Sequence, residues 1–178
     1  MVAGKGGVMT SRSRILAVLG AAIALTLTPI AVNFQTRLTY NPSPSAPVGF
    51  YLVEDMESSG ELSRGDYVVV PTPQKFRMMA AQRHYLPLNV PLIKQVVGLP
   101  GDQICRQGEV IYVNDKPFAT ALIIDNQGRS LPVWQGCLIL SEEQFFALMG
   151  MPDSFDGRYF GPLYVSDVVG IATPIYIP

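Results

Sequence analysis

The most prominent hydrophobic pattern in this chain is an uncharged run of 18 residues from Ile15 to Val32. At about 1.5 Å of rise per residue, a helix of this length can cross the hydrocarbon part of a bilayer. The run therefore predicts a transmembrane anchor over residues 15–34. A removable secretory signal is the alternative, but its apolar region is usually only about 7–15 residues long, and no convincing Ala-x-Ala cleavage site follows the run.

Positive charges precede this run, at Lys5, Arg12 and Arg14. Positively charged flanks of membrane spans remain on the cytoplasmic side. The predicted organisation is therefore a cytoplasmic N-terminal segment over residues 1–14, the anchor, and an extracytoplasmic domain over residues 35–178.

Short stretches of β-branched and apolar residues dominate the rest of the chain. They are Gly49–Val53, Tyr67–Val70, Leu92–Val97, Val110–Val113, Leu138–Leu140 and Val168–Ile171. Turn-forming sequences such as LPGD, NDKP and DNQG separate them, which is typical of strands joined by tight turns. The pattern predicts a mainly β fold: a compact β domain preceded by one N-terminal transmembrane helix.

Three segments depart from this strand-and-turn pattern. Residues Thr39 to Pro47 are rich in proline and serine, which favours extended or turn backbone over helix. The segment Ser141 to Gly150 has a capping-box-like start and a glycine stop that favour a short helix, yet Phe145 and Phe146 could equally lie in a buried strand. Residues Lys75 to Arg83 are compatible with a helical turn or a mobile insertion.

Composition narrows the functional classes. The chain has 178 residues, of which 48% are hydrophobic and 15% charged, which indicates one folded domain with a core and excludes a disordered protein. A formal net charge of −1 gives no basic surface, so nucleic acid is not expected as a partner. The chain has a single histidine, His84, and no CxxC or HExxH spacing, so neither a metal site nor a cofactor is expected.

Cys105 and Cys137 are the two cysteines of the chain. An even number of cysteines in a domain predicted to lie outside the cytoplasm predicts one structural disulfide. Two buried free thiols are the alternative, because pairing also needs suitable Cα geometry.

Ser45 lies in the segment NPSPSAPVGFY, where neighbouring prolines restrain the backbone around its hydroxyl. Gly49 allows a close approach by a substrate or a neighbouring strand. Such a rigid loop could present a nucleophile. The alternative is a proline-rich linker in which Ser43 and Ser45 only cap turns.

Lys94 interrupts an apolar stretch, PLIKQVVGLP, that has the pattern of a buried strand. Lysine is seldom fully buried unless it is paired or used. Burial disfavours the ammonium form and lowers the pKa, so the neutral amine could accept a proton from a serine hydroxyl such as that of Ser45. The alternative is a lysine on the solvent face of an edge strand.

Three sequence blocks in the chain occur in an order that identifies a family. The first, NPSPSAPVGFY, follows the pattern NxTxSxPxGxY at Asn41, Ser43, Ser45, Pro47, Gly49 and Tyr51, with serine in place of threonine at position 43. The second is KQVVGLPGD from Lys94, and the third is SFDGRYFGP from Ser154. Together they resemble the type I signal peptidase superfamily, peptidase family S26, and within it the TraF-type signal peptidases of conjugative transfer systems.

The resemblance implies a role for each block. Ser45 would be the nucleophile and Lys94 the general base. Ser43 would donate a hydrogen bond to the oxyanion, together with the backbone N–H of Ser45. The third block would supply the supporting residues Ser154, Asp156 and Arg158. In the family the serine hydrogen-bonds the lysine amine, and the aspartate and arginine form an ion pair.

The resemblance also implies an activity and a location. The chain would be a membrane-anchored serine endopeptidase that processes an exported, membrane-tethered precursor. The implied substrate is the propilin of a conjugative transfer system, and in some members cleavage is followed by cyclisation. Implied partners are a pilin or preprotein substrate, the lipid bilayer, and other components of conjugative transfer or type IV secretion. The implied location is the bacterial inner membrane, with a single span, a cytoplasmic N-terminus and a periplasmic catalytic domain.

Two other functions remain open at this point. A general type I signal peptidase would remove signal peptides from many secreted proteins, although this chain lacks the Gly-Asp-Asn element and the larger second β domain usual in those enzymes. A non-catalytic periplasmic β domain of an envelope assembly would use Ser45 as a linker residue and Lys94 as a surface residue.

Overall fold

The computed structural model describes residues 11–31 and 36–178, and the chain divides into two compact units, residues 1–35 and residues 36–178. The first unit contains helix α1 (Ser11–Ala31). Within the described residues, no helix is long and apolar enough to cross a membrane. The structure therefore does not support the transmembrane span predicted over residues 15–34, of which residues 32–34 lie outside the described part.

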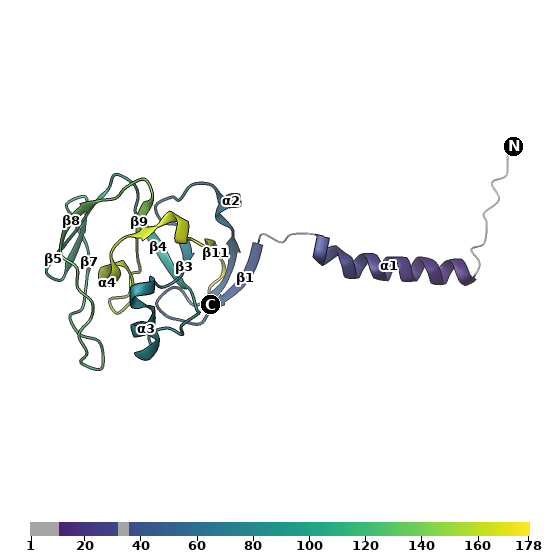
Figure 1. Ribbon diagram of the computed structural model, residues 1–178, viewed down its shortest axis with the longest axis horizontal. Coiled ribbons are helices and arrows are strands. Elements are labelled where there is room, and N and C mark those ends of the chain that lie inside the picture. Colours follow the sequence, from purple (N-terminus) through teal and green to yellow (C-terminus); the bar gives the residue numbers. More distant parts are fainter. Residues whose placement is uncertain (1–10, 32–35) are drawn as a thin grey trace. The chain divides into compact units, whose positions relative to one another are not determined.

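The second unit consists mainly of two antiparallel sheets (Figure 1). In spatial order, the seven-stranded sheet contains β1 (Thr36–Asn41), β2 (Gly49–Glu54), β11 (Gly170–Tyr176), β3 (Tyr67–Val70), β4 (Leu92–Gly98), β9 (Gln144–Leu148) and β10 (Leu163–Tyr164). The four-stranded sheet contains β7 (Lys116–Thr120), β6 (Val110–Val113), β5 (Gln103–Gln107) and β8 (Gly136–Ile139). The prediction of a mainly β domain is confirmed.

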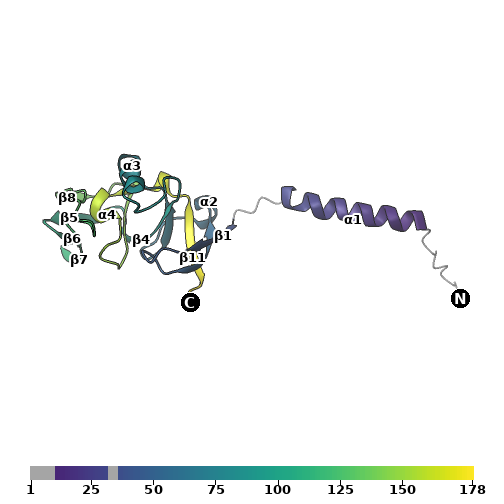
Figure 2. The same cartoon turned by 90° about the horizontal axis from the view of Figure 1, so that it is seen from below.

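Short helices connect some of these strands. They are α2 (Met56–Ser59), α3 (Gln74–Gln82), α4 (Gly157–Phe160) and a 3-10 turn at Val165–Asp167. Figures 1 and 2 place the four-stranded sheet at one end of this domain and the β1, β11 and α2 region at the other, with α3 and α4 between them. The helical alternative for residues 75–83 is therefore the correct one.

Strand β9 joins the two halves of the core. All four residues from Phe145 to Leu148 are buried. Successive side chains of a strand point to opposite faces, so Phe145 and Ala147 pack with Val68 and Val96, while Phe146 and Leu148 pack with a second cluster around Ile104. Of the two alternatives for residues 141–150, the buried strand is the correct one. The sequence left both open because a strand buried on both faces has no polar alternation to distinguish it from a short helix.

The strand predictions differ from the structure mainly in number. Within the described residues, five observed strands were not among the six predicted stretches: β1, β5, β7, β9 and β10. These strands are short or contain charged and polar residues, as in Thr36–Asn41 and Lys116–Thr120. The stretch Val168–Ile171 is also displaced, because Val165–Asp167 forms a 3-10 turn and β11 begins only at Gly170.

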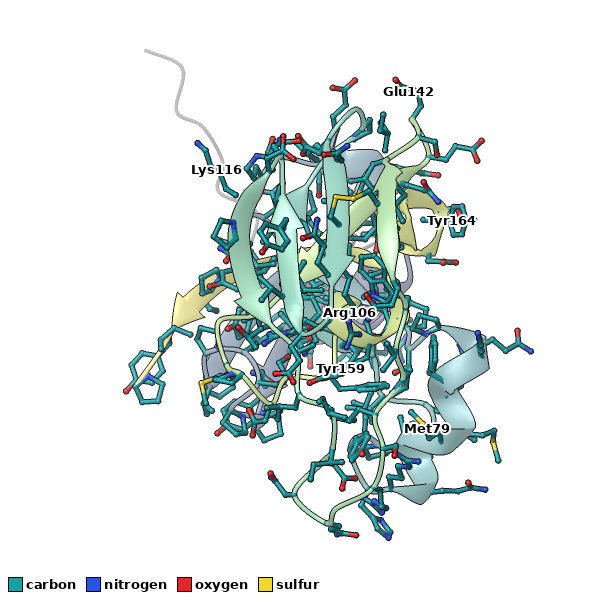
Figure 3. The ribbon with its side chains drawn as sticks, turned by 90° about the vertical axis from the view of Figure 1, so that its left-hand side faces the viewer. Met79, Arg106, Lys116, Glu142, Tyr159 and Tyr164 are labelled. Carbon is teal, nitrogen blue, oxygen red and sulfur yellow. A yellow bond between two sulfur atoms is a disulfide. The ribbon has the colours of Figure 1, made fainter. Side chains whose placement is uncertain are left out.

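The disulfide between Cys105 and Cys137 is present, as predicted. The two residues lie directly opposite each other on β5 and β8. Figure 3 shows the sulfur–sulfur bond among the strands of the four-stranded sheet. The bond therefore fastens the edge strand β8 to the middle of this sheet.

We expect the double variant Cys105→Ala/Cys137→Ala to lose about 2–4 kcal/mol of unfolding free energy, because the disulfide closes a loop across 32 positions and restricts the unfolded chain. Urea denaturation of oxidised protein would measure the loss. A reducing agent should lower the midpoint of the native protein but leave the double variant unchanged. Equal midpoints for oxidised native protein and double variant would contradict the expectation.

Candidate active site

The loop that carries Ser45 connects two paired strands. Strands β1 and β2 are antiparallel, and Asn41 lies opposite Gly49 at the end of the ladder. The buried side chain of Asn41 accepts a hydrogen bond from the backbone N–H of Ser43 and donates to the carbonyl oxygens of Ser43, Ala46 and Pro47. The segment is therefore a hairpin loop held by one amide side chain, and a flexible linker is excluded.

Two further residues of the first sequence block fix the far side of this loop. The hydroxyl of Tyr51 donates to the carbonyl oxygen of Pro47 at 2.6 Å. At Gly49 a Cβ atom would lie 2.1 Å from the carbonyl oxygen of Tyr176, so only glycine allows β11 to approach this closely. Of the two approaches suggested for Gly49, the structure shows that of a neighbouring strand.

Ser43 and Ser45 are brought together within the loop. Their Oγ atoms lie 2.9 Å apart, and the backbone N–H of Ser45 donates to Ser43 Oγ at 3.3 Å. Both side chains are half-buried. The loop thus presents two hydroxyls and one backbone N–H within a few ångströms of one another.

Lys94 lies in the apolar core and not on the solvent face of an edge strand. It is 1% exposed, shares a face of β4 with Leu92 and Val96, and is paired with Val68 of β3. Burial lowers the pKa of Lys94 to about 8. The charges of Asp156 and Asp153 raise this pKa and that of Arg158 lowers it, but burial is the largest effect.

The amine of Lys94 is held by Ser154. Lys94 Nζ donates a hydrogen bond to the buried Ser154 Oγ at 2.7 Å. Between the described residues Lys94 and Ser45 the structure has no hydrogen bond, since Ser45 Oγ instead pairs with Ser43. The structure thus brings together two pairs of candidate site residues, Lys94 with Ser154 and Ser43 with Ser45.

Asp156 and Arg158 form a buried ion pair two residues beyond Ser154. Arg158 donates to both carboxylate oxygens of Asp156, from Nε at 2.9 Å and from Nη2 at 2.8 Å. The carboxylate also accepts the backbone N–H groups of Met149 and Arg158. The remaining donors of Arg158 contact carbonyl oxygens, at Thr120, Met149 and Pro152. A buried charge pair needs this degree of hydrogen bonding to be tolerated.

Arg106 is a supporting residue that sequence reasoning missed. It is 1% exposed and donates to the carbonyl oxygens of Arg158 at 2.5 Å and of Gly108 at 3.1 Å. Burial lowers its pKa. Figure 3 shows Arg106 and Tyr159 at the lower end of the four-stranded sheet. The available signal was the position of Arg106 two residues after the apolar Ile104, because residues at this spacing in a strand point to the same face.

Ser43, Ser45 and Lys94 line the same cavity, which has a volume of about 330 Å³. Part of its wall is apolar, formed by Leu86, Leu92, Leu122, Leu131, Phe155 and Tyr159. The rest is polar or charged, and includes Arg83, His84, Asp125, Asn126, Gln127, Arg129 and Asp153. Concave apolar cavities with a few convergent polar groups are the usual form of binding sites.

One side of the cavity is built from segments that sequence analysis did not assign to a site. The residues just after α3 contribute Tyr85, and the loop between β7 and β8 contributes Asp125 and Arg129. Asp125 accepts hydrogen bonds from the Tyr85 hydroxyl and from Arg129 Nε. Partial burial raises the pKa of Asp125, but these and further hydrogen bonds outweigh that effect and hold it well below its usual value. This wall joins residues about 40 positions apart.

Within the part of the chain that the structure describes, no group of three or more His, Cys, Asp or Glu side chains is placed to hold a metal ion. The candidate catalytic groups in the cavity are two hydroxyls, one amine of lowered pKa, and the backbone N–H of Ser45.

The chain is similar to several known proteins. Residues 11–177 match the family described as Signal peptidase, peptidase S26. The Conjugal transfer protein TraF of Agrobacterium fabrum is 30% identical over 145 residues, 76% of this chain and 80% of that protein. A Plasmid transfer protein TraF of Escherichia coli is 27% identical over 88% of this chain and 92% of its own length.

A signal peptidase I of Enterococcus faecalis V583 is a solved structure with 19% sequence identity and a TM-score of 0.39, covering 64% of this chain and 98% of that structure. The family match extends over almost the whole described chain and includes all three sequence blocks. The chain therefore belongs to the signal peptidase family, peptidase S26, and has relatives among the TraF proteins of plasmid transfer.

Proposed function

We propose that this protein is a serine endopeptidase in which Ser45 is the nucleophile and Lys94 the general base. The observation that carries the proposal is a lysine amine, 1% exposed and with a pKa lowered to about 8, lining the same cavity as a loop serine. A neutral amine can take the serine proton, which an ordinary surface lysine at neutral pH cannot do.

In the first step the lone pair of Lys94 Nζ takes the proton of Ser45 Oγ, and Oγ bonds to the carbonyl carbon of the substrate. The backbone N–H of Ser45 and the hydroxyl of Ser43 donate to the resulting oxyanion. For this, the Ser43 hydroxyl turns from its contact with Ser45 Oγ toward the substrate oxygen, and the backbone N–H of Ser45 exchanges Ser43 Oγ for the same oxygen. Hydrogen bonds of catalytic groups often form only once substrate is bound, so Ser45 need not contact Lys94 in the free protein.

In the second step the Lys94 ammonium gives its proton to the departing amine as the carbon–nitrogen bond breaks, leaving an ester on Ser45. Ser154 supports both steps, because it accepts a hydrogen bond from Lys94 Nζ at 2.7 Å and fixes the direction of the amine. A second nucleophile, water or an amine, then attacks the ester, with Lys94 again acting as base.

The proposed substrate is an exported precursor protein, and specifically the propilin of a conjugative transfer system. The TraF relatives are named as conjugal or plasmid transfer proteins, and they span most of this chain. Small side chains next to the cleaved bond are expected from the family resemblance, and the apolar part of the cavity wall is compatible with them. We further propose a location at the bacterial inner membrane, with the catalytic domain in the periplasm.

We expect Ser45→Ala and Lys94→Ala each to reduce cleavage of a propilin or small-residue peptide by about 10⁴-fold or more, because either change removes a group that forms or breaks the bond. Mass spectrometry of the cleaved peptide and of the acyl-enzyme would measure this. Ser141→Ala and Lys116→Ala are the matched controls, since both positions are exposed and lie outside the cavity. Full activity in Ser45→Ala would place the nucleophile elsewhere, and no cleavage by the native protein would favour a non-catalytic domain.

The acylation rate should rise as pH increases through about 8 and level off above it, because Lys94 acts as a base only when it is neutral. Below that pH the ammonium predominates and cannot take the Ser45 proton. Single-turnover kinetics with the full chain would give the profile. The ascending limb should persist in Lys116→Ala and be absent from the residual rate of Lys94→Ala; its survival there would place the base elsewhere.

Membrane attachment is a separate part of the proposal, supported by the uncharged run from Ile15 to Val32 and not by any membrane-spanning helix in the described residues. We expect the full-length protein to stay with the membrane fraction after an alkaline carbonate wash, because a spanning helix resists extraction. Its release into the supernatant would remove the anchor from the proposal without affecting the peptidase chemistry.

A further inference from the structure

Arg83 lies at the C-terminal end of α3 and lines the same cavity as Ser45 and Lys94. Its side chain is half-buried. One guanidinium nitrogen, Nη1, donates to the carbonyl oxygen of Ser130 at 2.8 Å and approaches the Tyr85 hydroxyl at 3.5 Å. Both acceptors are neutral, so these contacts position the guanidinium and leave its charge unbalanced.

Arg129, the other arginine of the same wall, does have an ionic partner. Its Nε forms an ion pair with Asp125 at 2.6 Å, Nη2 donates to the backbone carbonyl of Arg83, and its guanidinium lies over the Tyr85 ring. Its charge is therefore neutralised within the wall. Among the described residues the ion pairs involve Arg64, Arg129 and Arg158, and none involves Arg83.

The other charged groups of the cavity do not replace this missing partner. The carboxylate of Asp125 is committed to Arg129 and Tyr85. Asp153 also lines the cavity, and its charge acts on Lys94. His84, next to Arg83, brings no negative charge. The wall formed by α3 and the β7–β8 loop therefore presents one rigid guanidinium with free donors to the cavity.

We propose that Arg83 is a specificity-determining residue that binds an acidic side chain, aspartate or glutamate, of the peptide in the cavity. This inference rests on the proposed peptidase function. The planar guanidinium offers several N–H donors that match a carboxylate, and partial burial strengthens such a contact relative to one in open water. The wall contacts hold the guanidinium in place before the peptide binds, so less side-chain entropy is lost on binding.

The test uses the full chain carrying Ser45→Ala, so that peptides bind without being cut. Short, fluorescently labelled, alanine-rich peptides carry a single Glu, Gln or Lys that is moved through every position. At one position we expect Glu to bind about three- to tenfold more tightly than Gln, and Lys more weakly still, as for a partly exposed charge-assisted contact. The preference should shrink as salt concentration rises.

Arg83→Gln in the same background should abolish the preference for Glu, while Arg83→Lys should keep part of it. Arg77→Gln is the matched control, because Arg77 belongs to the same helix but lies outside this cavity. Arg83→Glu should reverse the order and favour the Lys peptide. Thermal melting of each variant would identify changes that act through folding alone.

Equal affinity for the three peptides at every position, or no binding of any of them, would overturn the inference. So would an equal loss of preference in Arg77→Gln and Arg83→Gln. Failure of the proposed function is distinguishable, because it would appear as unchanged cleavage in Ser45→Ala or as no cleavage by the native protein. A native enzyme that cleaves peptides without regard to their charge would remove only the role of Arg83.

Discussion

The burial of one primary amine is the constraint on which the rest of this structure depends. Lys94 occupies a core position on β4 between Leu92 and Val96, where a hydrophobic residue would carry no penalty for desolvating a charge. Lowering its pKa from 10.5 to about 8 corresponds to roughly 3 kcal/mol against the ammonium form. The fold tolerates the amine because Ser154 accepts its hydrogen bond. The burial that disfavours the ammonium form of Lys94 also favours the neutral amine that the proposed mechanism requires.

The support for this amine extends into the second sheet. Ser154 is followed by the buried pair of Asp156 and Arg158, and Arg106 of β5 donates to the backbone of Arg158. Lys94 is hydrogen-bonded to Ser154, which lies two residues before Asp156 in the chain. The ion pair of Asp156 with Arg158 and the hydrogen bond from Arg106 then connect this segment to β5, a strand of the sheet that carries the disulfide. The four-stranded sheet therefore supports the site indirectly, because none of the described residues that line the cavity belongs to its strands.

The sequence allowed prediction of what depends on local pattern. The stretches Tyr67–Val70 and Val110–Val113 form strands with the predicted bounds. For Lys94 the sequence left burial and exposure open, and the structure shows burial. The family resemblance directed attention to Ser154 and its neighbours. Contacts between distant residues could not be predicted in this way. Asn41 holds its loop through hydrogen bonds to carbonyl oxygens, which leave no periodic pattern in the sequence. Tyr85 and Asp125 meet in the cavity wall although they lie in segments 40 positions apart.

The position of the four-stranded sheet in the chain has a further consequence. Strands β4 and β9 are hydrogen-bonded neighbours, yet the chain leaves β4 at Gly98 and returns at Gln144. Residues 99–143, including the loop with Asp125 and Arg129, therefore form one insertion between two adjacent strands. Its length and loop sequence can diverge between relatives while the strand that bears Lys94 keeps its register. The cavity wall that carries Asp125 and Arg129 can therefore change without altering the residues proposed for bond cleavage.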